Sequence, residues 1–130
     1  MYKPALIAGT LSAIVAVIAG AFGAHVLKHI LSADQYSVFS TAVRFHFYHC
    51  FALIFTGILY KSFPYKLLKQ ATWLFVIGTV LFCGSLLVIN LLSIIGGSIG
   101  IIGIVTPIGG LCFILGWLFL LLGILKKEVA

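Results

Sequence analysis

Residues 32–60 read SADQYSVFSTAVRFHFYHCFALIFTGILY, and this stretch shows most clearly what kind of protein the chain forms. From Thr41 onward it is apolar enough for a membrane-spanning helix, yet Arg44, His46 and His49 lie near its start. Ionisable side chains at membrane depth are costly and by default face the protein interior or a cavity. We therefore predict that the start of this span is the functional end of the molecule.

The segment before the span carries the signals of a helix N-terminus. Ser32 and Gln35 fit a capping box, with Ser32 at the N-cap and Gln35 three residues later. Asp34 in the first turn suits the positive end of the helix dipole. A helix over residues 33–60 would be about 42 Å long, which exceeds the ~30 Å hydrocarbon core of a bilayer. Its first two turns, residues 33–40, are therefore predicted to lie in the membrane interface.

The composition of the whole chain is typical of an integral membrane protein. Of the 130 residues, 63% are hydrophobic and only 8% are charged, whereas a soluble domain is about one quarter charged. We predict one all-α transmembrane domain over residues 1–130, folded as a four-helix bundle. The first apolar run is interpreted as a retained span rather than a signal peptide, because it has the ~20 residues that a spanning helix needs. The spans are expected at about 4–27, 41–60, 71–92 and 107–125.

The basic residues predict the orientation of the four spans. One side of the membrane would carry six lysines and one glutamate, and the other would carry one lysine, one arginine and one aspartate. The positive-inside rule then places both termini in the cytoplasm, with the protein in a bacterial plasma membrane. Because these cations flank apolar runs, membrane lipids rather than nucleic acid are the predicted partners. The first side has Lys3, Lys61, Lys66, Lys69, Lys126, Lys127 and Glu128, and the second has Lys28, Asp34 and Arg44.

Small residues recur at helical spacing in the first and fourth spans. Small side chains let membrane helices approach closely, so these positions predict packing seams in a tight left-handed bundle. The alternative is that glycine is simply frequent in membrane helices. The seam of the first span is Gly9, Ala13, Ala16, Gly20 and Gly23, and that of the fourth is Gly109, Gly116 and Gly123.

The connection between the third and fourth spans, residues 93–106, has no charge and four glycines. Such an apolar loop is expected to dip into the outer leaflet or to lie against the bundle, where its backbone is covered by protein or faces water. Thr106 and Pro107 are predicted to serve as the N-cap and the first residue of the fourth helix.

Four histidines lie towards the predicted outer side. His25 and His29 are four residues apart and His46 and His49 three apart, so each pair shares a helix face. Neutral imidazole is a common metal ligand, but Asp34 is the only carboxylate nearby. We therefore predict no metal site and no cofactor, and the four imidazoles are the only candidate metal ligands. For the two deeper histidines we expect a hydrogen bond to a neighbouring helix, with proton handling or ligand binding as the alternative.

Other polar groups at the same level complete the candidate site. Arg44 is about 200° around the helix from His46, so it is expected to reach the outer headgroups or a second subunit. Asn90 is expected to hydrogen-bond a neighbouring helix or to complete a polar pocket with His49. Trp117 falls in the middle of its helix, where a packing role is expected.

Four motifs in order along the chain resemble one known family. They are AGAFGAHVLK at 19–28, TAVRFHFYHCFALI at 41–54, LFCGSLLVIN at 81–90 and TPIGGLCFILGW at 106–117. These motifs resemble the small membrane proteins grouped as domain of unknown function 423, to which the eukaryotic transmembrane protein 256 group looks related. The resemblance implies a four-span helical membrane protein without an established activity or cofactor, so it transfers no catalytic residue. Among the histidines, His25 and His49 match the family pattern.

The sequence favours a non-enzymatic protein, because carboxylates are nearly absent and no paired nucleophile is recognisable. The leading hypothesis is a polar pocket on the outer side, formed by His25, His49, Asn90 and Arg44, that binds a lipid or small amphiphile. A homo-oligomer is a further expectation. The alternatives are a small oligomeric channel or proton-coupled transporter and, third, a membrane redox or metal-binding subunit.

Overall fold

The computed structural model describes residues 1–126, so Lys127 and Glu128 of the charge prediction lie outside the described residues. All regular structure in that range is helical. Two short segments, η1 and η2, have the wider π-helical winding inside otherwise α-helical rods. In chain order the elements are α1 (Lys3–Phe22), η1 (Gly23–Leu27), α2 (Lys28–Ile30), α3 (Ala33–Leu59), α4 (Lys66–Gly78), η2 (Thr79–Cys83), α5 (Gly84–Ile95) and α6 (Ile102–Leu125).

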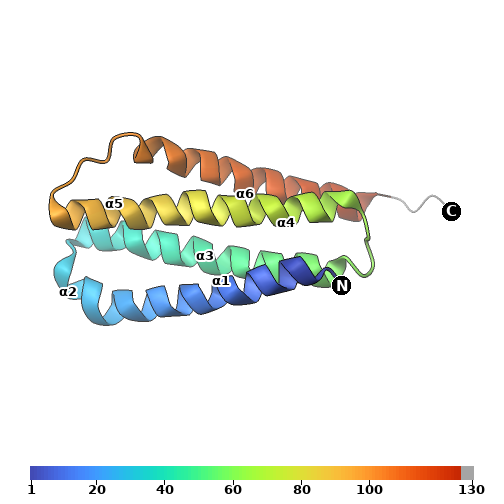
Figure 1. Cartoon of the computed structure of the whole chain (residues 1–130), viewed down its shortest axis with the longest axis horizontal. Helices are drawn as coiled ribbons and strands as arrows, with labels where there is room; N and C mark the ends of the chain where they lie inside the picture. The colour runs from blue at the N-terminus through green and yellow to red at the C-terminus, as the bar shows by residue number, and fades with distance from the viewer. Residues whose placement is uncertain (127–130) are drawn as a thin grey trace.

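These elements form four rods that are long and apolar enough to cross a membrane, which confirms the four predicted spans. The first rod runs from α1 through η1 to α2, the second is α3, the third runs from α4 through η2 to α5, and the fourth is α6. The rods lie side by side, and the N-terminus and the end of α6 are at the same end of the bundle (Figure 1).

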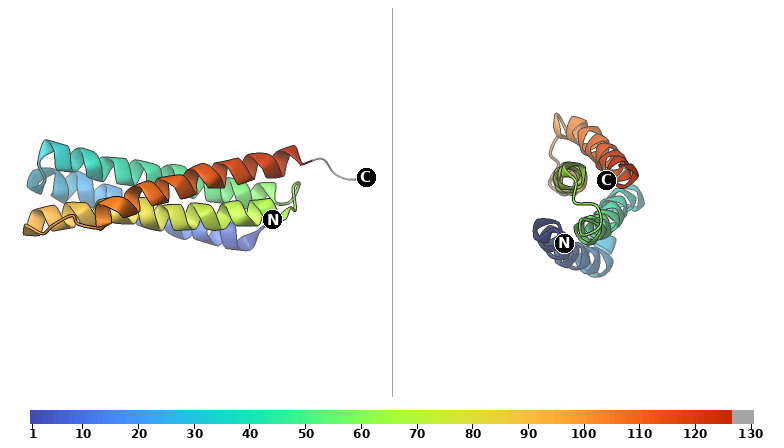
Figure 2. Two further views of the ribbon diagram at one scale, coloured as in Figure 1. Left: turned by 90° about the horizontal axis from the view of Figure 1, so that it is seen from above. Right: turned by 90° about the vertical axis from the view of Figure 1, so that its right-hand side faces the viewer.

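The bundle consists of two closely packed helix pairs. The helix α1 packs along α3, while α4 and η2 pack along α6. The two pairs meet where α3 contacts α4, η2 and α5, so that α1 and α6 lie on opposite sides of the molecule (Figure 2). The helices α3 and α6 therefore both pack on the third rod without packing closely along each other.

The start of α3 has the predicted capping box. The Gln35 backbone N–H donates to the Ser32 hydroxyl oxygen at 3.2 Å, and the Ser32 backbone N–H donates to the Gln35 side-chain carbonyl at 2.9 Å. From there α3 continues without a break to Leu59. One helix thus joins the predicted interfacial turns to the span that carries the histidines.

Both predicted small-residue seams are confirmed as places where helices approach closely. At Gly9, a Cβ atom would lie 2.8 Å from Ile54 Cγ1 and 3.0 Å from the backbone oxygen of Cys50, both on α3. At Gly109, a Cβ would lie 2.8 Å from the Cα of Phe82 in η2. The remaining glycines of the α6 seam are also buried and face side chains of α4; they are Gly116 against Phe75 and Gly123 against Leu68.

The predicted start of the fourth helix is wrong. The helix α6 begins at Ile102, Pro107 lies inside it, and the Thr106 hydroxyl does not cap it but hydrogen-bonds the Ser85 hydroxyl of α5 at 2.6 Å. Pro107 is the sixth residue of α6 and removes one backbone hydrogen bond of the helix. The turn ahead of it is formed by the bond from Ile102 N–H to the Ile99 carbonyl at 3.1 Å.

The connecting loop is correspondingly shorter than predicted. The helix α5 ends at Ile95 and is followed by Gly96, whose left-handed φ of 73° is a conformation that favours glycine. Residues 96–101 are all exposed at the end of the bundle rather than packed against it.

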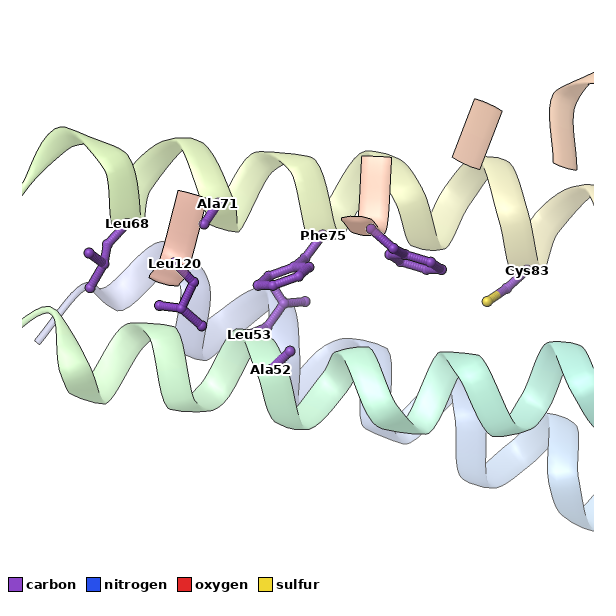
Figure 3. Close-up of a cluster of buried hydrophobic side chains, with 8 residues drawn as sticks. Ala52, Leu53, Leu68, Ala71, Phe75, Cys83 and Leu120 are labelled. Atoms are coloured by element: carbon purple, nitrogen blue, oxygen red, sulfur yellow. The ribbon is translucent and has the colours of Figure 1, made fainter. Parts of the chain in front are cut away.

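The buried hydrophobic cluster lies between α3, the third rod and α6. Side chains of α4 point towards α3, with Phe75 and Leu53 facing each other at its centre (Figure 3). Phe113 of α6 completes the cluster from the other side. This packing fixes the aromatic surroundings of His49, which lies beside Phe75 and Phe113.

Candidate functional site

His49 lies near the middle of the membrane-spanning length of α3. It is ten residues from Leu59 at the helix end, which is about 15 Å at the α-helical rise. That distance is half of the ~30 Å hydrocarbon core. His46 lies one turn further towards the start of α3, and both side chains are buried.

Both nitrogens of His49 have hydrogen-bond partners. Its Nδ1 lies 2.7 Å from the backbone carbonyl oxygen of Phe45, and the indole N–H of Trp117 donates to its Nε2 at 3.2 Å. A carbonyl only accepts and an indole N–H only donates, so these partners specify a neutral imidazole with the proton on Nδ1. The expected hydrogen bond to a neighbouring helix is confirmed, and it occupies the lone pair that a metal ion would need.

The His49 ring is also held by stacking. It lies almost parallel to the ring of Phe113, with centroids 3.4 Å apart and an interplanar angle of 8°. Phe75 and Trp117 approach it at steeper angles. The sequence favoured a packing role for Trp117, but its indole N–H also donates a hydrogen bond to His49. A tryptophan N–H at mid-membrane needs an acceptor, and that requirement was the available signal for this contact.

His46 makes the matching contact with the first helix of the bundle. Its Nε2 lies 2.7 Å from the Ser12 hydroxyl oxygen of α1. The expected bond to a neighbouring helix is again confirmed. The two histidines together join α3 to α1 and to α6. The helix α1 is the close packing partner of α3, whereas α3 and α6 do not form one of the main packing pairs of the bundle.

A groove of about 710 Å³ lies between α3 and α6. Its α3 wall is formed by Phe45, Tyr48 and His49, and its α6 wall by residues between Pro107 and Trp117. Tyr48 is 54% exposed and Trp117 47% exposed, so the groove opens on the outer surface of the bundle. His49 and Trp117 are its highest-numbered residues on the two helices, and since α3 and α6 run in the same direction, their hydrogen bond lies at one end of the groove.

The other predicted site residues lie elsewhere in the structure. Asn90 lines a separate cavity of about 270 Å³, and Arg44 lines another of about 230 Å³. His25 in η1 and His29 in α2 are exposed. The described cavities thus separate His49, Asn90 and Arg44 instead of bringing them into one pocket.

Two further expectations are settled by the geometry. The Asn90 amide N–H donates to the Leu86 carbonyl of its own helix at 3.0 Å, so the expected bond from Asn90 to a neighbouring helix is wrong. Arg44 is exposed while His46 is buried, which confirms that they face different directions. Within residues 1–126, no three His, Cys, Asp or Glu side chains are grouped so that they could hold a metal ion.

The fold and the groove define a small, helical, multi-span membrane protein. Residues 19–110 match the family model described as protein of unknown function DUF423, and the chain belongs to this family. The predicted resemblance is thereby confirmed.

Bacterial proteins of similar length are similar to this chain over almost its whole length. The UPF0382 membrane protein SSP2132 of Staphylococcus saprophyticus is 41% identical over 124 residues, covering 95% of this chain and 98% of its own length. The UPF0382 membrane protein YwdK of Bacillus subtilis is 34% identical over 125 residues, with 95% and 98% coverage. No solved structure gives a significant match. The relatives are named as membrane proteins, in agreement with the four spans of this chain.

Proposed function

We propose that the groove between α3 and α6 holds an acyl chain of a membrane lipid or small amphiphile. The observation that carries this proposal is a groove of about 710 Å³ on the outer surface of the bundle, with walls that are aliphatic and aromatic almost throughout. Ligand sites are typically concave and mostly apolar, with few polar groups. A groove between membrane-spanning helices is open to lipid from the side, so a chain can enter it without crossing the protein.

The length of the groove fits a chain from one leaflet. Its α6 wall extends from Pro107 to Trp117, ten residue steps or about 15 Å. Half of the ~30 Å hydrocarbon core has the same length. The bond between His49 and Trp117 limits the groove near the bilayer centre, where the end of such a chain lies.

The predicted orientation makes this the outer leaflet. The end of the bundle that holds the N-terminus and the end of α6 carries Lys3, Lys61, Lys66, Lys69 and Lys126, and Lys28 belongs to the other end. By the positive-inside rule the first end is cytoplasmic. The Arg44 side chain is exposed and is expected to contact lipid headgroups of the outer leaflet. It lies ten residues, about 15 Å, from Asp34 along α3, which is too far for an ion pair between the two.

Reporter fusions test this orientation. Alkaline phosphatase, which needs an oxidising compartment to form its disulfides, is expected to be active when inserted in the loop of residues 96–101 and inactive when fused after Lys126. Green fluorescent protein fused after Lys126 is the control and should fluoresce. The reverse pattern would place the groove in the inner leaflet.

Trp117 provides the direct test of groove occupancy. In the Trp73→Phe variant, Trp117 is the only tryptophan. When lipid with brominated acyl chains is titrated into micelles, quenching of its fluorescence is expected to saturate at a low mole fraction, because the chain occupies a defined site beside the indole.

A blocked groove should change the shape of that titration. Gly110 lines the groove, and a Cβ there would make only an ordinary contact with the Phe82 ring at 3.8 Å, so Gly110→Phe is expected to fill the groove from α6. Quenching should then rise in proportion to the brominated lipid, as expected for random contact. Ile104→Phe, on an exposed side chain of the same helix outside the groove, is the matched control and should keep the saturating curve. Proportional quenching in all three proteins would contradict the proposal.

Proton transport, the alternative from the sequence, remains a prediction. No contact among the described residues points to it in particular. The hydrogen bonds of His46 and His49 are those of side chains that join helices. A homo-oligomer likewise remains a prediction.

A further inference from the structure

A second cavity, distinct from the groove, lies at the end of the bundle where α2 meets α3. Its volume is about 270 Å³, and it is bounded by side chains of the first rod, by Phe39 of α3 and by α5. No charged side chain lines it. Phe39 is twenty residues from Leu59, about 30 Å along the helix, so the cavity lies where the hydrocarbon core gives way to the interface.

One wall of this cavity is held in place by the π-helical segment η1. Gly23, the first residue of η1, lies directly against the Phe39 ring, and a Cβ there would be 2.9 Å from Phe39 Cζ. Phe39 is only 5% exposed. Its ring is therefore fixed between the first rod and α5, and this wall of the cavity is preformed.

Asn90 gives the cavity its only side-chain hydrogen-bonding group. The residue is 4% exposed, and its amide nitrogen already donates to the Leu86 carbonyl. Its Oδ1 has no partner among the described residues. Because no fully buried side-chain nitrogen or oxygen in that range lacks a partner, Oδ1 keeps some accessible surface, and the cavity is the one that Asn90 lines. The cavity therefore presents one free acceptor, a carbonyl oxygen, in apolar surroundings.

We propose that this cavity binds a neutral, single-chain amphiphile whose terminal hydroxyl donates a hydrogen bond to Asn90 Oδ1. A free acceptor selects a donor, because a polar group buried without its partner is costly. Ethers, esters and phosphodiesters offer only acceptors and would leave Oδ1 unpaired. The absence of charge in the lining disfavours an ionic headgroup, and the small volume suits one chain rather than two.

A matched pair of probes tests this selection. One is a decyl-chain alcohol with a photoreactive diazirine on the chain, and the other is its methyl ether, which cannot donate. The purified protein is labelled in an amine-oxide detergent, since sugar detergents carry hydroxyls of their own. Peptide mass spectrometry then measures labelling of the segment from Leu87 to Ile94. We expect the alcohol to label about fivefold more than the ether, the factor that corresponds to one net hydrogen bond.

Three variants give the test its controls. Asn90→Leu removes the acceptor at similar volume and should reduce the ratio of alcohol to ether labelling to about one. Ser93→Ala removes a hydroxyl of the same helix that bonds the Ile89 carbonyl and should keep the fivefold ratio. Ala19→Leu narrows the cavity, which Ala19 lines, and should lower labelling by both probes.

Equal labelling of the natural protein by both probes would overturn the proposal, since water would then satisfy Oδ1 equally well. A fivefold ratio that persists in Asn90→Leu would also overturn it. If Asn90→Leu fails to fold, displacement of the photoreactive alcohol from the natural protein by unlabelled alcohol, but not by unlabelled ether, is the supporting result. Gly110→Phe blocks only the groove between α3 and α6, so this labelling is independent of the outcome there.

Discussion

Replacing Gly109 by alanine is expected to destabilise the protein by about 2 kcal/mol, a typical cost of overpacking at a close contact. The added Cβ would lie 2.8 Å from the Cα of Phe82. This neighbour is backbone and not the end of a flexible side chain, so α6 must move away from η2. Van der Waals packing between helices is a main source of stability within a membrane, and the displacement would reduce it along the α4–α6 pair. Unfolding of the purified protein in mixed micelles measures the loss.

The adjacent glycine is the matched control. A Cβ at Gly110 would meet nothing closer than the Phe82 ring at 3.8 Å, an ordinary contact. Gly110→Ala should therefore leave stability unchanged or raise it by up to about 1 kcal/mol, because alanine is the better helix former. A similar loss in both variants would contradict the close approach at Gly109.

Replacing His49 by alanine is expected to cost about 3 kcal/mol, within the range for truncating a large buried side chain. The substitution removes the ring between Phe75 and Phe113 and both of its hydrogen bonds. His29→Ala, at an exposed position of α2, is the control and should change stability by less than about 0.5 kcal/mol.

A double-mutant cycle isolates the contact with Trp117. Hydrogen bonds between membrane helices contribute about 1 kcal/mol. The losses of unfolding free energy in His49→Ala and in Trp117→Phe, added together, should therefore exceed the loss in the double variant by about that amount. Strict additivity would mean that the two side chains do not interact in the folded protein.

The sequence predicted the architecture because its main determinants are local. Four apolar runs of spanning length, small residues at Gly9 and Gly109, and the Ser32–Gln35 capping box each act within one helix or on its nearest neighbour. The hydrogen bonds of His46 and His49 were expected for a similar reason, because a buried imidazole in a membrane needs a partner.

The features that the sequence did not predict depend on where one helix lies along another. Pro107 looked like a helix start, but contacts of α6 with α5 let the helix begin at Ile102. The π-helical segments η1 and η2 have no simple sequence signature. Asn90 and His49 were placed at one level, yet they line different cavities at different depths. His49 lies about 15 Å from the Leu59 end of α3, whereas the cavity of Asn90 includes Phe39, about 30 Å from that end.

Native mass spectrometry of the detergent-purified protein tests most directly whether the groove between α3 and α6 holds a lipid. We predict one retained lipid chain per subunit in the natural protein and in Ile104→Phe, and at least a fivefold lower occupancy in Gly110→Phe. The same spectra report the number of subunits. Equal lipid occupancy in all three proteins would contradict the account. It would also be contradicted if the natural protein retained no lipid and Gly110→Phe instead lost a second subunit that the natural protein has.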